Sequence, residues 1–358
     1  MLYEIGSHYE KADLQPLQNE FAFGCDQAFL LSGRTAIDYV IRNIKDKRKL
    51  ETVLLPSYCC YTMVEPFLRH GIRTTFYSVQ IGKDGWEMIF PQEGAPDAVL
   101  LMQYFGFCDK AILKIADMWK KQGVVVIEDA THSFFSGLPY TGFSDYVYCS
   151  FRKWTGIECG AIAFSQASVF SLPKPPKIKE EYMALVRSAM EAKRKYLSGQ
   201  IPAKDHLPLF AKAEDVLQAD YWDYGVDADV VFGIEHLDVE KIKKKRQHNA
   251  RILIEGLRWI PEVRSVKTSI SEDDCPLCVP VVIENGVRDS LRGYLIKEGI
   301  YCPIHWPEPG QVLLSSETKN LYKQTLSLVC DQRYEEDDMK HILTTIKDFF
   351  SQEHSKNC

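Results

Sequence analysis

The sequence predicts an α/β protein with a mostly parallel sheet flanked by helices and a smaller α+β region at its C-terminal end. Strand-like apolar runs alternate with helical patterns through the first two-thirds of the 358 residues. The run VVVI at 124–127 is continuously apolar, which is typical of strands covered on both faces, as in a parallel sheet. From Val263 onward, strand and helix patterns mix. We therefore expect a large domain over 1–235 and a small α+β domain over 236–358.

Seven short apolar segments are expected to form the strands of the large sheet. Amphipathic helices are expected between them over 32–44, 60–71 and 110–123, and the last two end at glycines, which commonly terminate helices. The expected strands cover residues 28–31, 52–59, 74–79, 98–106, 124–133, 144–151 and 160–165.

The remaining segments predict longer helices and a second set of short elements. A helix over 180–198 lies between proline-rich flanks, and it could serve either as a lid or as a dimer arm. A second long amphipathic helix covers 238–260, and its Lys and Arg run is expected to be a solvated face. A strand over 277–284 and helices over 287–299 and 334–352 are expected in the small domain.

Composition excludes several classes of function. The formal net charge of -6 gives no electrostatic footprint for DNA or RNA. No apolar run is long enough to cross a bilayer, and the N-terminal segment lacks the pattern of a signal peptide. The expectation is a cytoplasmic protein without nucleic-acid or membrane partners.

The eleven cysteines do not have the spacing of a disulfide framework. A single C-x-x-C motif, CPLC at Cys275–Cys278, lies in a strand-like segment. A structural zinc site would need a second pair of ligands at suitable spacing, which the sequence does not offer. The motif is therefore either a redox pair or, as we favour, a pair of buried thiols.

Three polar clusters follow strands of the predicted sheet, at the ends where ligands of parallel α/β sheets bind. The turn SGRTA at 32–36 opens a helix whose free N–H groups suit a phosphate, although the same residues also form ordinary helix caps. Asp129 and His132 follow a buried strand, where a carboxylate must be paired, and a structural salt bridge is the alternative. Lys153 follows the next strand, either as a reactive amine or as an exposed loop lysine.

The three clusters together favour one chemistry. An anion-binding turn, a strand-end Asp and a strand-end Lys occur in this order on one predicted sheet. Pyridoxal phosphate needs an anion cradle, a carboxylate that keeps its pyridine nitrogen protonated, and an amine that reacts with its aldehyde. The combination predicts a pyridoxal-phosphate site.

Five segments in order along the chain resemble the DegT/StrS family of pyridoxal-phosphate-dependent sugar aminotransferases. SGRTAI resembles the family's SGTAAL turn, and CSFRKWTGIECGAIAF resembles its segment in which a Ser and a Lys precede G-[DE]-G-G-A. The resemblance implies fold type I, the aspartate-aminotransferase fold, with a seven-stranded, mostly parallel sheet. The five segments are residues 32–37, 54–79, 102–133, 149–164 and 299–309.

The resemblance implies a role for each matched position. Lys153 would bind pyridoxal 5'-phosphate covalently and later move a proton, Asp129 would face the pyridine nitrogen, and His132 would lie near the ring oxygen. The other implied cofactor-binding residues are Gly33, Arg34, Thr35, Cys60, Tyr61 and Ser150. The implied substrate-binding residues are Arg152, His305 and Trp306.

The chain departs from the family pattern at three places. Cys60 stands where the family usually has an aromatic residue on the cofactor face, so Tyr58 or Tyr61 is expected to substitute. WDYGVDAD at 222–229 replaces a segment that reaches the neighbouring subunit's site, and it lacks the family's Asn and Arg. The loop around Lys153 is also shorter than the common form, and the adjacent Arg152 is expected to supply the missing positive charge.

The activity implied is that of a homodimeric aminotransferase that takes an amino group from glutamate or a similar donor. The implied acceptor is a keto sugar, nucleotide-linked in the family, in surface-polysaccharide or amino-sugar biosynthesis. One alternative is an enzyme of the same fold that acts on a non-sugar carbonyl or catalyses another reaction. Another is a non-catalytic relative. The presence of Lys153 argues against the dehydratase branch, which replaces this lysine.

Overall fold

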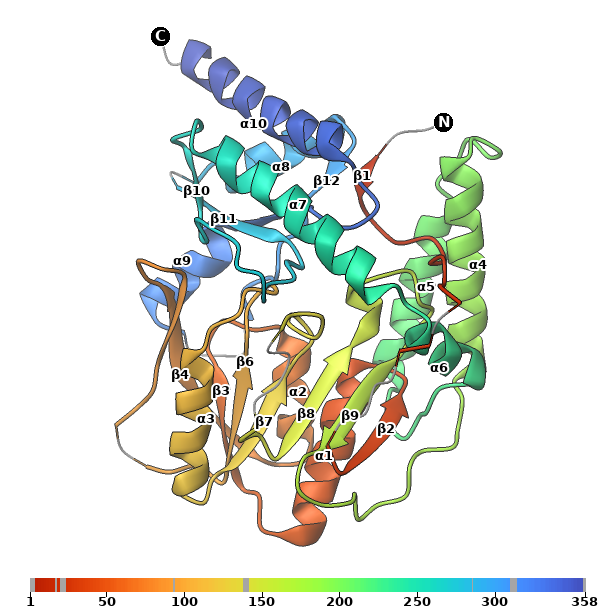
Figure 1. Cartoon of the computed structure of the whole chain (residues 1–358), viewed down its shortest axis with the longest axis vertical. Coiled ribbons are helices and arrows are strands. Elements are labelled where there is room, and N and C mark those ends of the chain that lie inside the picture. The colour runs from red at the N-terminus through yellow and green to blue at the C-terminus, as the bar shows by residue number, and fades with distance from the viewer. Residues whose placement is uncertain are drawn as a thin grey trace.

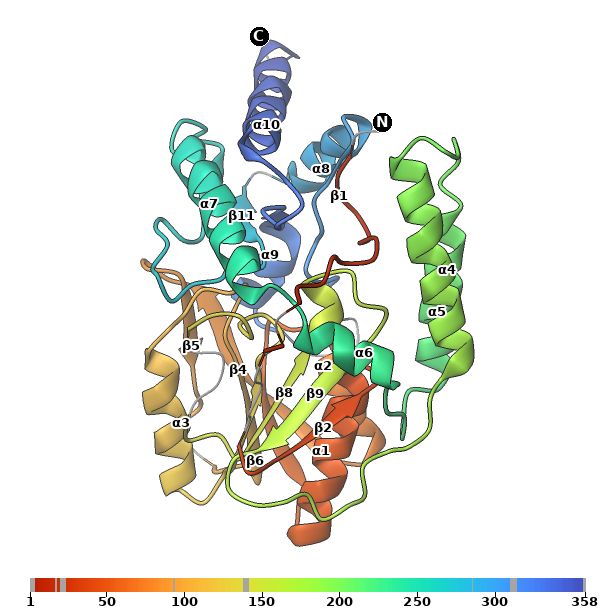
Figure 2. The same cartoon turned by 45° about the vertical axis from the view of Figure 1, so that its right-hand side comes forward.

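The computed structural model describes residues 4–16, 18–19, 24–92, 94–137, 142–284, 286–309 and 314–356. Its main sheet has the strand order β2-β9-β8-β7-β6-β3-β4-β5; in Figure 1 the labelled strands run from β4 at the left to β2 at the right, and β5 is labelled in Figure 2. The strands are β2 (Asp26–Leu30), β3 (Thr52–Pro56), β4 (Arg73–Ile81), β5 (Trp86–Ile89), β6 (Ala98–Met102), β7 (Val125–Asp129), β8 (Tyr146–Ser150) and β9 (Ala161–Ser165).

The predicted sheet is confirmed in its strands and in their direction. β8, β7, β6, β3 and β4 are parallel neighbours, whereas β9 runs antiparallel to both β8 and β2. Every residue of β6, β7, β8 and β9 is buried, as the continuous apolar runs predicted. The sheet also has an eighth strand, because β5 forms a hairpin with β4 that the sequence did not reveal.

Three helices connect the parallel strands. They are α1 (Gly33–Lys47), α2 (Tyr61–Arg69) and α3 (Ala111–Lys121), as predicted to within a few residues at each end. In Figure 1, α3 lies in front of the sheet, whereas α1 and α2 lie behind it. α1 packs against β8 and β9, so its first turn lies close to the carboxyl end of β8.

A helical hairpin stands beside the sheet. It consists of α4 (Glu180–Leu197), which was predicted, and α5 (His206–Ala219), which was not, and the two helices pack closely on each other. Figure 2 shows the hairpin at the right-hand side of the molecule, facing the chain's N-terminal segment. The short helix α6 (Ala228–Glu235) follows it.

The C-terminal region lies above the main sheet in Figure 1. Its three-stranded antiparallel sheet has the order β10-β11-β13, and β1 pairs in parallel with β12. The strands are β1 (Ile5–Gly6), β10 (Val263–Ser265), β11 (Val279–Ile283), β12 (Ile300–Tyr301) and β13 (Thr325–Leu328). The helices are α7 (Val239–Leu257), α8 (Arg288–Lys297), α9 (Ser316–Gln324) and α10 (Glu336–Lys356).

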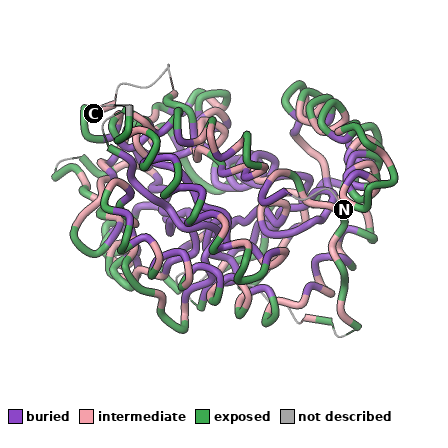
Figure 3. The backbone as a smooth tube through the Cα atoms, turned by 90° about the horizontal axis from the view of Figure 1, so that it is seen from above, coloured by how far each residue is buried: buried purple, intermediate pink, exposed green. Residues whose placement is uncertain are grey.

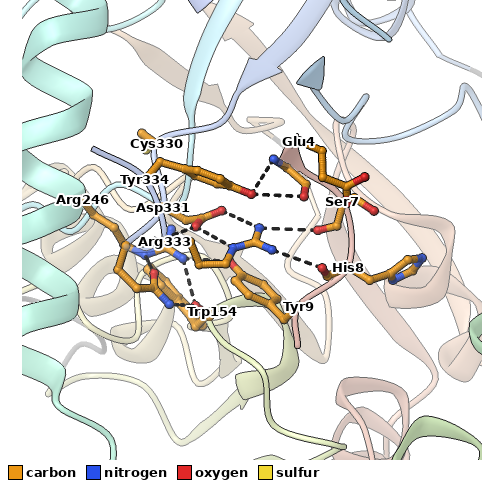
Figure 4. A network of polar contacts seen from close by, with 12 residues as sticks. Glu4, Ser7, His8, Tyr9, Trp154, Arg246, Cys330, Asp331, Arg333 and Tyr334 are labelled. Carbon is orange, nitrogen blue, oxygen red and sulfur yellow. Dashed lines mark hydrogen bonds and ion pairs between the residues drawn. The ribbon is translucent and has the colours of Figure 1, made fainter. Parts of the chain in front are cut away.

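A partly buried polar network joins the N-terminal segment to this C-terminal region (Figure 4). The Arg333 guanidinium pairs with Asp331 at 2.8 Å and donates to the His8 carbonyl at 3.1 Å. The Gly6 N–H donates to the Tyr334 hydroxyl at 2.7 Å. These contacts hold residues 4–9 in a fixed path beside the main sheet.

The buried residues are concentrated in the strands and on the inner faces of the helices, as Figure 3 shows from above. The cysteines of the CPLC motif are buried and precede β11, so they do not lie within the strand. Burial raises the pKa of both thiols to about 12, which favours the interpretation as inert thiols. Within the described ranges, no His, Cys, Asp and Glu side chains gather as metal ligands, and no helix is long and apolar enough to span a bilayer.

Candidate active site

Lys153 lies one short turn beyond the end of β8, where the sequence placed it. The strand ends at Ser150, and a 3-10 turn covers Phe151–Lys153. The Trp154 indole N–H donates to the Thr131 carbonyl at 2.8 Å, and the buried Arg246 donates to the Trp154 carbonyl at 2.9 Å. These bonds fix the backbone at Trp154, the residue that follows Lys153.

The loop after Lys153 packs directly on the N-terminal segment. The Ala12 N–H donates to the Gly156 carbonyl at 2.9 Å. A side chain at Gly156 is excluded because the Glu10 carbonyl lies where its Cβ would be. The N-terminal segment and the loop after Lys153 are therefore in direct backbone contact.

Asp129 ends β7 and is buried beside the end of β8. Its carboxylate accepts a hydrogen bond from the Thr131 N–H at 2.8 Å. Burial raises the pKa of Asp129, although the positive charge of Lys153 opposes this shift. Tyr148 is its register partner on β8, and the Tyr148 hydroxyl lies beside the carboxyl without a well-formed hydrogen bond to the described residues. The buried Asp129 carboxylate can therefore accept a hydrogen bond from one further donor.

His132 approaches the Lys153 amine most closely among the predicted residues. Its Nε2 lies 3.5 Å from Lys153 Nζ, and its Nδ1 accepts from the Phe105 N–H at 3.4 Å. The bond at Nδ1 places the proton of the neutral ring on Nε2. Burial, with the charge of Lys153, lowers the pKa of His132 well below its usual value, so the ring is neutral. His132 can therefore donate a hydrogen bond from Nε2 toward the space beside Lys153.

The first turn of α1 meets the end of β8 at Gly33. A Cβ placed at Gly33 would lie 3.5 Å from the Ser150 Cβ, so these two predicted phosphate contacts are neighbours. Thr35 is more constrained than expected, because its N–H donates to the Ser32 side chain at 3.2 Å and its hydroxyl donates to the Tyr221 carbonyl at 2.7 Å. The free anion-binding groups of this turn are accordingly at Gly33 and Arg34.

Glu214 of α5 joins the two arginines that flank this region. Its carboxylate lies 3.0 Å from Arg34 Nη2 and 3.3 Å from Arg152 Nη1. One carboxylate therefore faces two guanidinium groups, and a positive charge is left over. Sequence reasoning predicted Arg152 as an anion contact but did not find Glu214, because α5 itself was not predicted.

A cavity of about 740 Å³ opens on Lys153. Arg152 and His305 also line it, and the hairpin α4–α5 forms one wall. The opposite side comes from the N-terminal segment and the C-terminal region. Asp129, His132 and Ser150 lie deeper, at the ends of the strands, and do not line this cavity.

The predicted substrate residues His305 and Trp306 have different positions. His305 lines the cavity, and burial with the charge of Lys153 lowers its pKa to about 3. Trp306 is not a lining residue of that cavity; its ring stacks on His132 with centroids 5.5 Å apart. Trp306 therefore packs on the His132 ring without lining the cavity.

The structure also distinguishes between the two tyrosines that were expected to cover the cofactor face. Tyr58 is fully buried, stacks with Tyr104 and donates to the His305 carbonyl, so it is a core residue. Tyr61 is half-buried at the start of α2, directly after the half-buried Cys60. Of the two tyrosines, Tyr61 is the one with solvent-accessible surface.

No family model matches this sequence, and no curated protein matches it in sequence. Solved structures do match the fold. A DegT DnrJ EryC1 StrS aminotransferase from Brucella abortus is 18% identical, with a TM-score of 0.62 over 91% of this chain and 86% of that one. PseC from Helicobacter pylori, an aminotransferase of pseudoaminic acid biosynthesis, is 12% identical, with a TM-score of 0.67 over 98% and 100% of the two chains.

A third similar structure carries a cofactor. NtdA from Bacillus subtilis, with bound PMP, is 14% identical, and its TM-score is 0.59 over 90% of this chain and 74% of that one. At these identities the similarity is one of fold. The chain has the fold type I architecture of DegT/StrS sugar aminotransferases, as the sequence motifs predicted.

Proposed function

We propose that this chain is a pyridoxal-phosphate-dependent aminotransferase. The observation that carries the proposal is the position of Lys153: its amine faces a cavity of about 740 Å³ and lies 3.5 Å from His132 Nε2. The buried Asp129 ends β7, and the first turn of α1 meets the end of β8, the strand next to β7. The fold shared with sugar aminotransferases supports the same proposal.

The side chains at the strand ends fit pyridoxal 5'-phosphate. The N–H groups at Gly33 and Arg34 and the Ser150 hydroxyl would hold its phosphate. Asp129 would pair with the protonated pyridine nitrogen, since a carboxylate that accepts the Thr131 N–H can accept a further donor. Lys153 would supply the amine that binds the aldehyde. When bound, the cofactor supplies an electron sink for the negative charge that develops at the substrate carbon.

The chain's own groups then have distinct tasks. Asp129 would hold the proton on the ring nitrogen, because a buried carboxylate is stabilised by an adjacent positive charge. His132 would orient the ring oxygen through its Nε2–H, and Trp306 stacks on the imidazole and keeps it in place. Lys153 would accept a proton from the substrate carbon that bears the transferred nitrogen and deliver it to the carbon on the other side of that nitrogen, a 1,3 shift.

We propose glutamate or a similar amino acid as the amino donor and a nucleotide-linked keto sugar as the acceptor. The DegT/StrS-like motifs and the fold support this choice. The active form is proposed to be a cytoplasmic homodimer, because sites of this fold form next to a subunit interface. Amino-sugar or surface-polysaccharide biosynthesis is the corresponding pathway class.

The proposal is tested by reconstitution. The purified chain is mixed with pyridoxal phosphate, treated with borohydride and digested, and mass spectrometry locates the reduced adduct. We expect the adduct at Lys153, its loss in Lys153→Ala, and its retention when the exposed Lys212 is changed to Ala. An adduct spread over several surface lysines, equal in Lys153→Ala, would contradict the proposal.

A second candidate function is transamination of a non-sugar carbonyl compound. It is favoured by the apolar part of the cavity wall, which includes Val186, Met190, Leu207 and Phe210. Amino donors supplied singly, followed by panels of keto acids and nucleotide-linked keto sugars, separate the two candidates. Turnover with the keto acids alone would select the second.

A further inference from the structure

The cavity has a second cationic end, away from the strand ends that carry Asp129. Lys204, which follows α4, and Arg292 of α8 both line it, together with Tyr301 of β12. Lys204 Nζ lies 2.7 Å from the Tyr301 hydroxyl. Arg292 Nε donates at 3.2 Å to the carbonyl of Cys302, the residue after Tyr301. The three side chains therefore meet around one short strand.

The positive charge at this end exceeds the negative charge. Glu4 lies beside the buried Lys193 and pairs at 3.0 Å with Lys204; burial lowers the pKa of Lys193 to about 7, so the full positive charges at this end are those of Lys204 and Arg292. Arg292 has no carboxylate partner among the residues that the structure describes, and its guanidinium donates to the Cys302 carbonyl. Unbalanced cations at a concave surface attract anions, in a chain whose net charge is -6.

The cationic end of the cavity is also held in place by contacts within the chain before any ligand binds. Glu4 belongs to the N-terminal segment whose contacts to Arg333 and Tyr334 are drawn in Figure 4. β1 pairs with β12, which fixes Tyr301 beside this segment. Preorganised donors lower the ordering cost of binding.

Between the two ends the hairpin wall is largely apolar, apart from Tyr182 and Glu214. Val186, Met190, Leu207 and Phe210 are apolar, and they line the cavity from both helices of the hairpin. A substrate that lies along this wall is recognised mainly at its two ends, one at Lys153 and one at Lys204 and Arg292.

We propose that Lys204, Arg292 and the Tyr301 hydroxyl form a binding site for an anionic group of the acceptor, either a phosphate or a carboxylate. The site is built within a single chain. Its assignment to the acceptor rests on the proposed aminotransferase function, whereas anion binding itself does not. The two charged groups would hold the acceptor so that its carbonyl reaches the Lys153 amine.

Calorimetric titration with inorganic pyrophosphate and, separately, with citrate tests the site on the cofactor-loaded protein. We expect one of the two probes to bind, and its affinity to fall about tenfold in Arg292→Gln and in Lys204→Met, since each removes one charge-assisted contact. The matched control is Lys212→Met, on an exposed position of α5, which should bind as the parent does. Binding of pyrophosphate identifies phosphate as the group, and binding of citrate identifies carboxylate.

The proposal is overturned if neither probe binds, or if both site variants bind like Lys212→Met. Should Lys204→Met fold poorly because Glu4 loses a partner, Arg292→Gln alone decides, since Arg292 makes only a backbone contact here. Titrating Lys153→Ala with the same probes separates the anion-site proposal from the aminotransferase proposal. Binding that persists without the reactive amine supports the anion site even where no cofactor adduct forms.

Discussion

The Lys153 side chain lies between two regions of different construction. On one side, Asp129, His132 and Ser150 are almost fully buried at the ends of β7 and β8. On the other side, the cavity is walled by the α4–α5 hairpin and by the N-terminal segment, with half-exposed ion pairs such as Arg152–Glu214. The strand-end region follows from the sheet, whereas the hairpin region depends on contacts between segments far apart in the sequence.

The difference separates two parts of the function. The strand-end region holds groups suited to the cofactor, and its geometry is set by strands that pair throughout the fold. The hairpin region holds groups suited to the acceptor. Substitutions in the first region should abolish chemistry, and substitutions in the second should alter affinity or stability while the cofactor still binds.

The largest effect is expected for Lys153. Lys153→Ala removes the proposed amine, and Lys153→Arg keeps the charge but cannot exchange a proton at neutral pH. Both should lower kcat/KM by about 10,000-fold, near the upper range for a positioned acid–base group. Single-turnover transamination of the bound cofactor by glutamate measures the loss. Activity within tenfold of the parent in either variant would remove Lys153 from the mechanism.

Asp129→Asn should give the next largest effect. It removes the negative charge that would balance the pyridinium, and breaking a buried charge pair costs about 3 kcal/mol, which corresponds to roughly 100-fold. The measurements are kcat/KM and the absorbance of the bound cofactor. Glu128→Gln is the control, because Glu128 is also buried on β7 but bonds to Ser144 at 2.7 Å. Equal cofactor spectra in the two variants would contradict the role of Asp129.

Much of the strand-end region could be predicted from the sequence because its signals are local. VVVI before Asp129 and the strand before Lys153 each predict a buried strand that ends at a polar group. Parallel strands then bring these ends to one edge of the sheet. The same logic could not place Trp306, which stacks behind His132, or Tyr58, which lies in the core.

The hairpin region gave weaker signals. α5 has a proline in its first turn and little amphipathic contrast, so its periodicity does not predict a helix. The role of Glu214 depends on its ion pairs with Arg34 and Arg152, which are distant from it in sequence. β5 and the pairing of β1 with β12 were missed for the same reason, since short strands depend on partners that the sequence does not reveal.

Glu214→Gln tests the hairpin region with a smaller expected effect. Arg34 and Arg152 lose their shared carboxylate, but the Glu214 side chain is 37% exposed, so solvent screens the pair. We expect the free energy of unfolding to fall by about 1 kcal/mol, measured by urea denaturation. Asp215→Asn removes the same charge from an exposed neighbour on α5 and should have no measurable effect. A larger loss in Asp215→Asn than in Glu214→Gln would show that the shared ion pair does not support the fold.

The smallest effect concerns His305, where the two regions meet. Burial and Lys153 lower its pKa to about 3 in the folded chain, whereas an unfolded histidine titrates near pH 6.5. Between these values the unfolded state binds more protons, so stability decreases as the pH falls from 6.5 toward 3. His305→Gln removes this contribution and should narrow the difference in Tm between pH 7 and pH 5 by a few degrees at most, on the order expected for a domain of this size. Scanning calorimetry measures it, with His248→Gln on the exposed face of α7 as the control. If both variants keep the parent's pH dependence, His305 is protonated at the same pH in the folded and unfolded states, and its burial beside Lys153 does not affect stability.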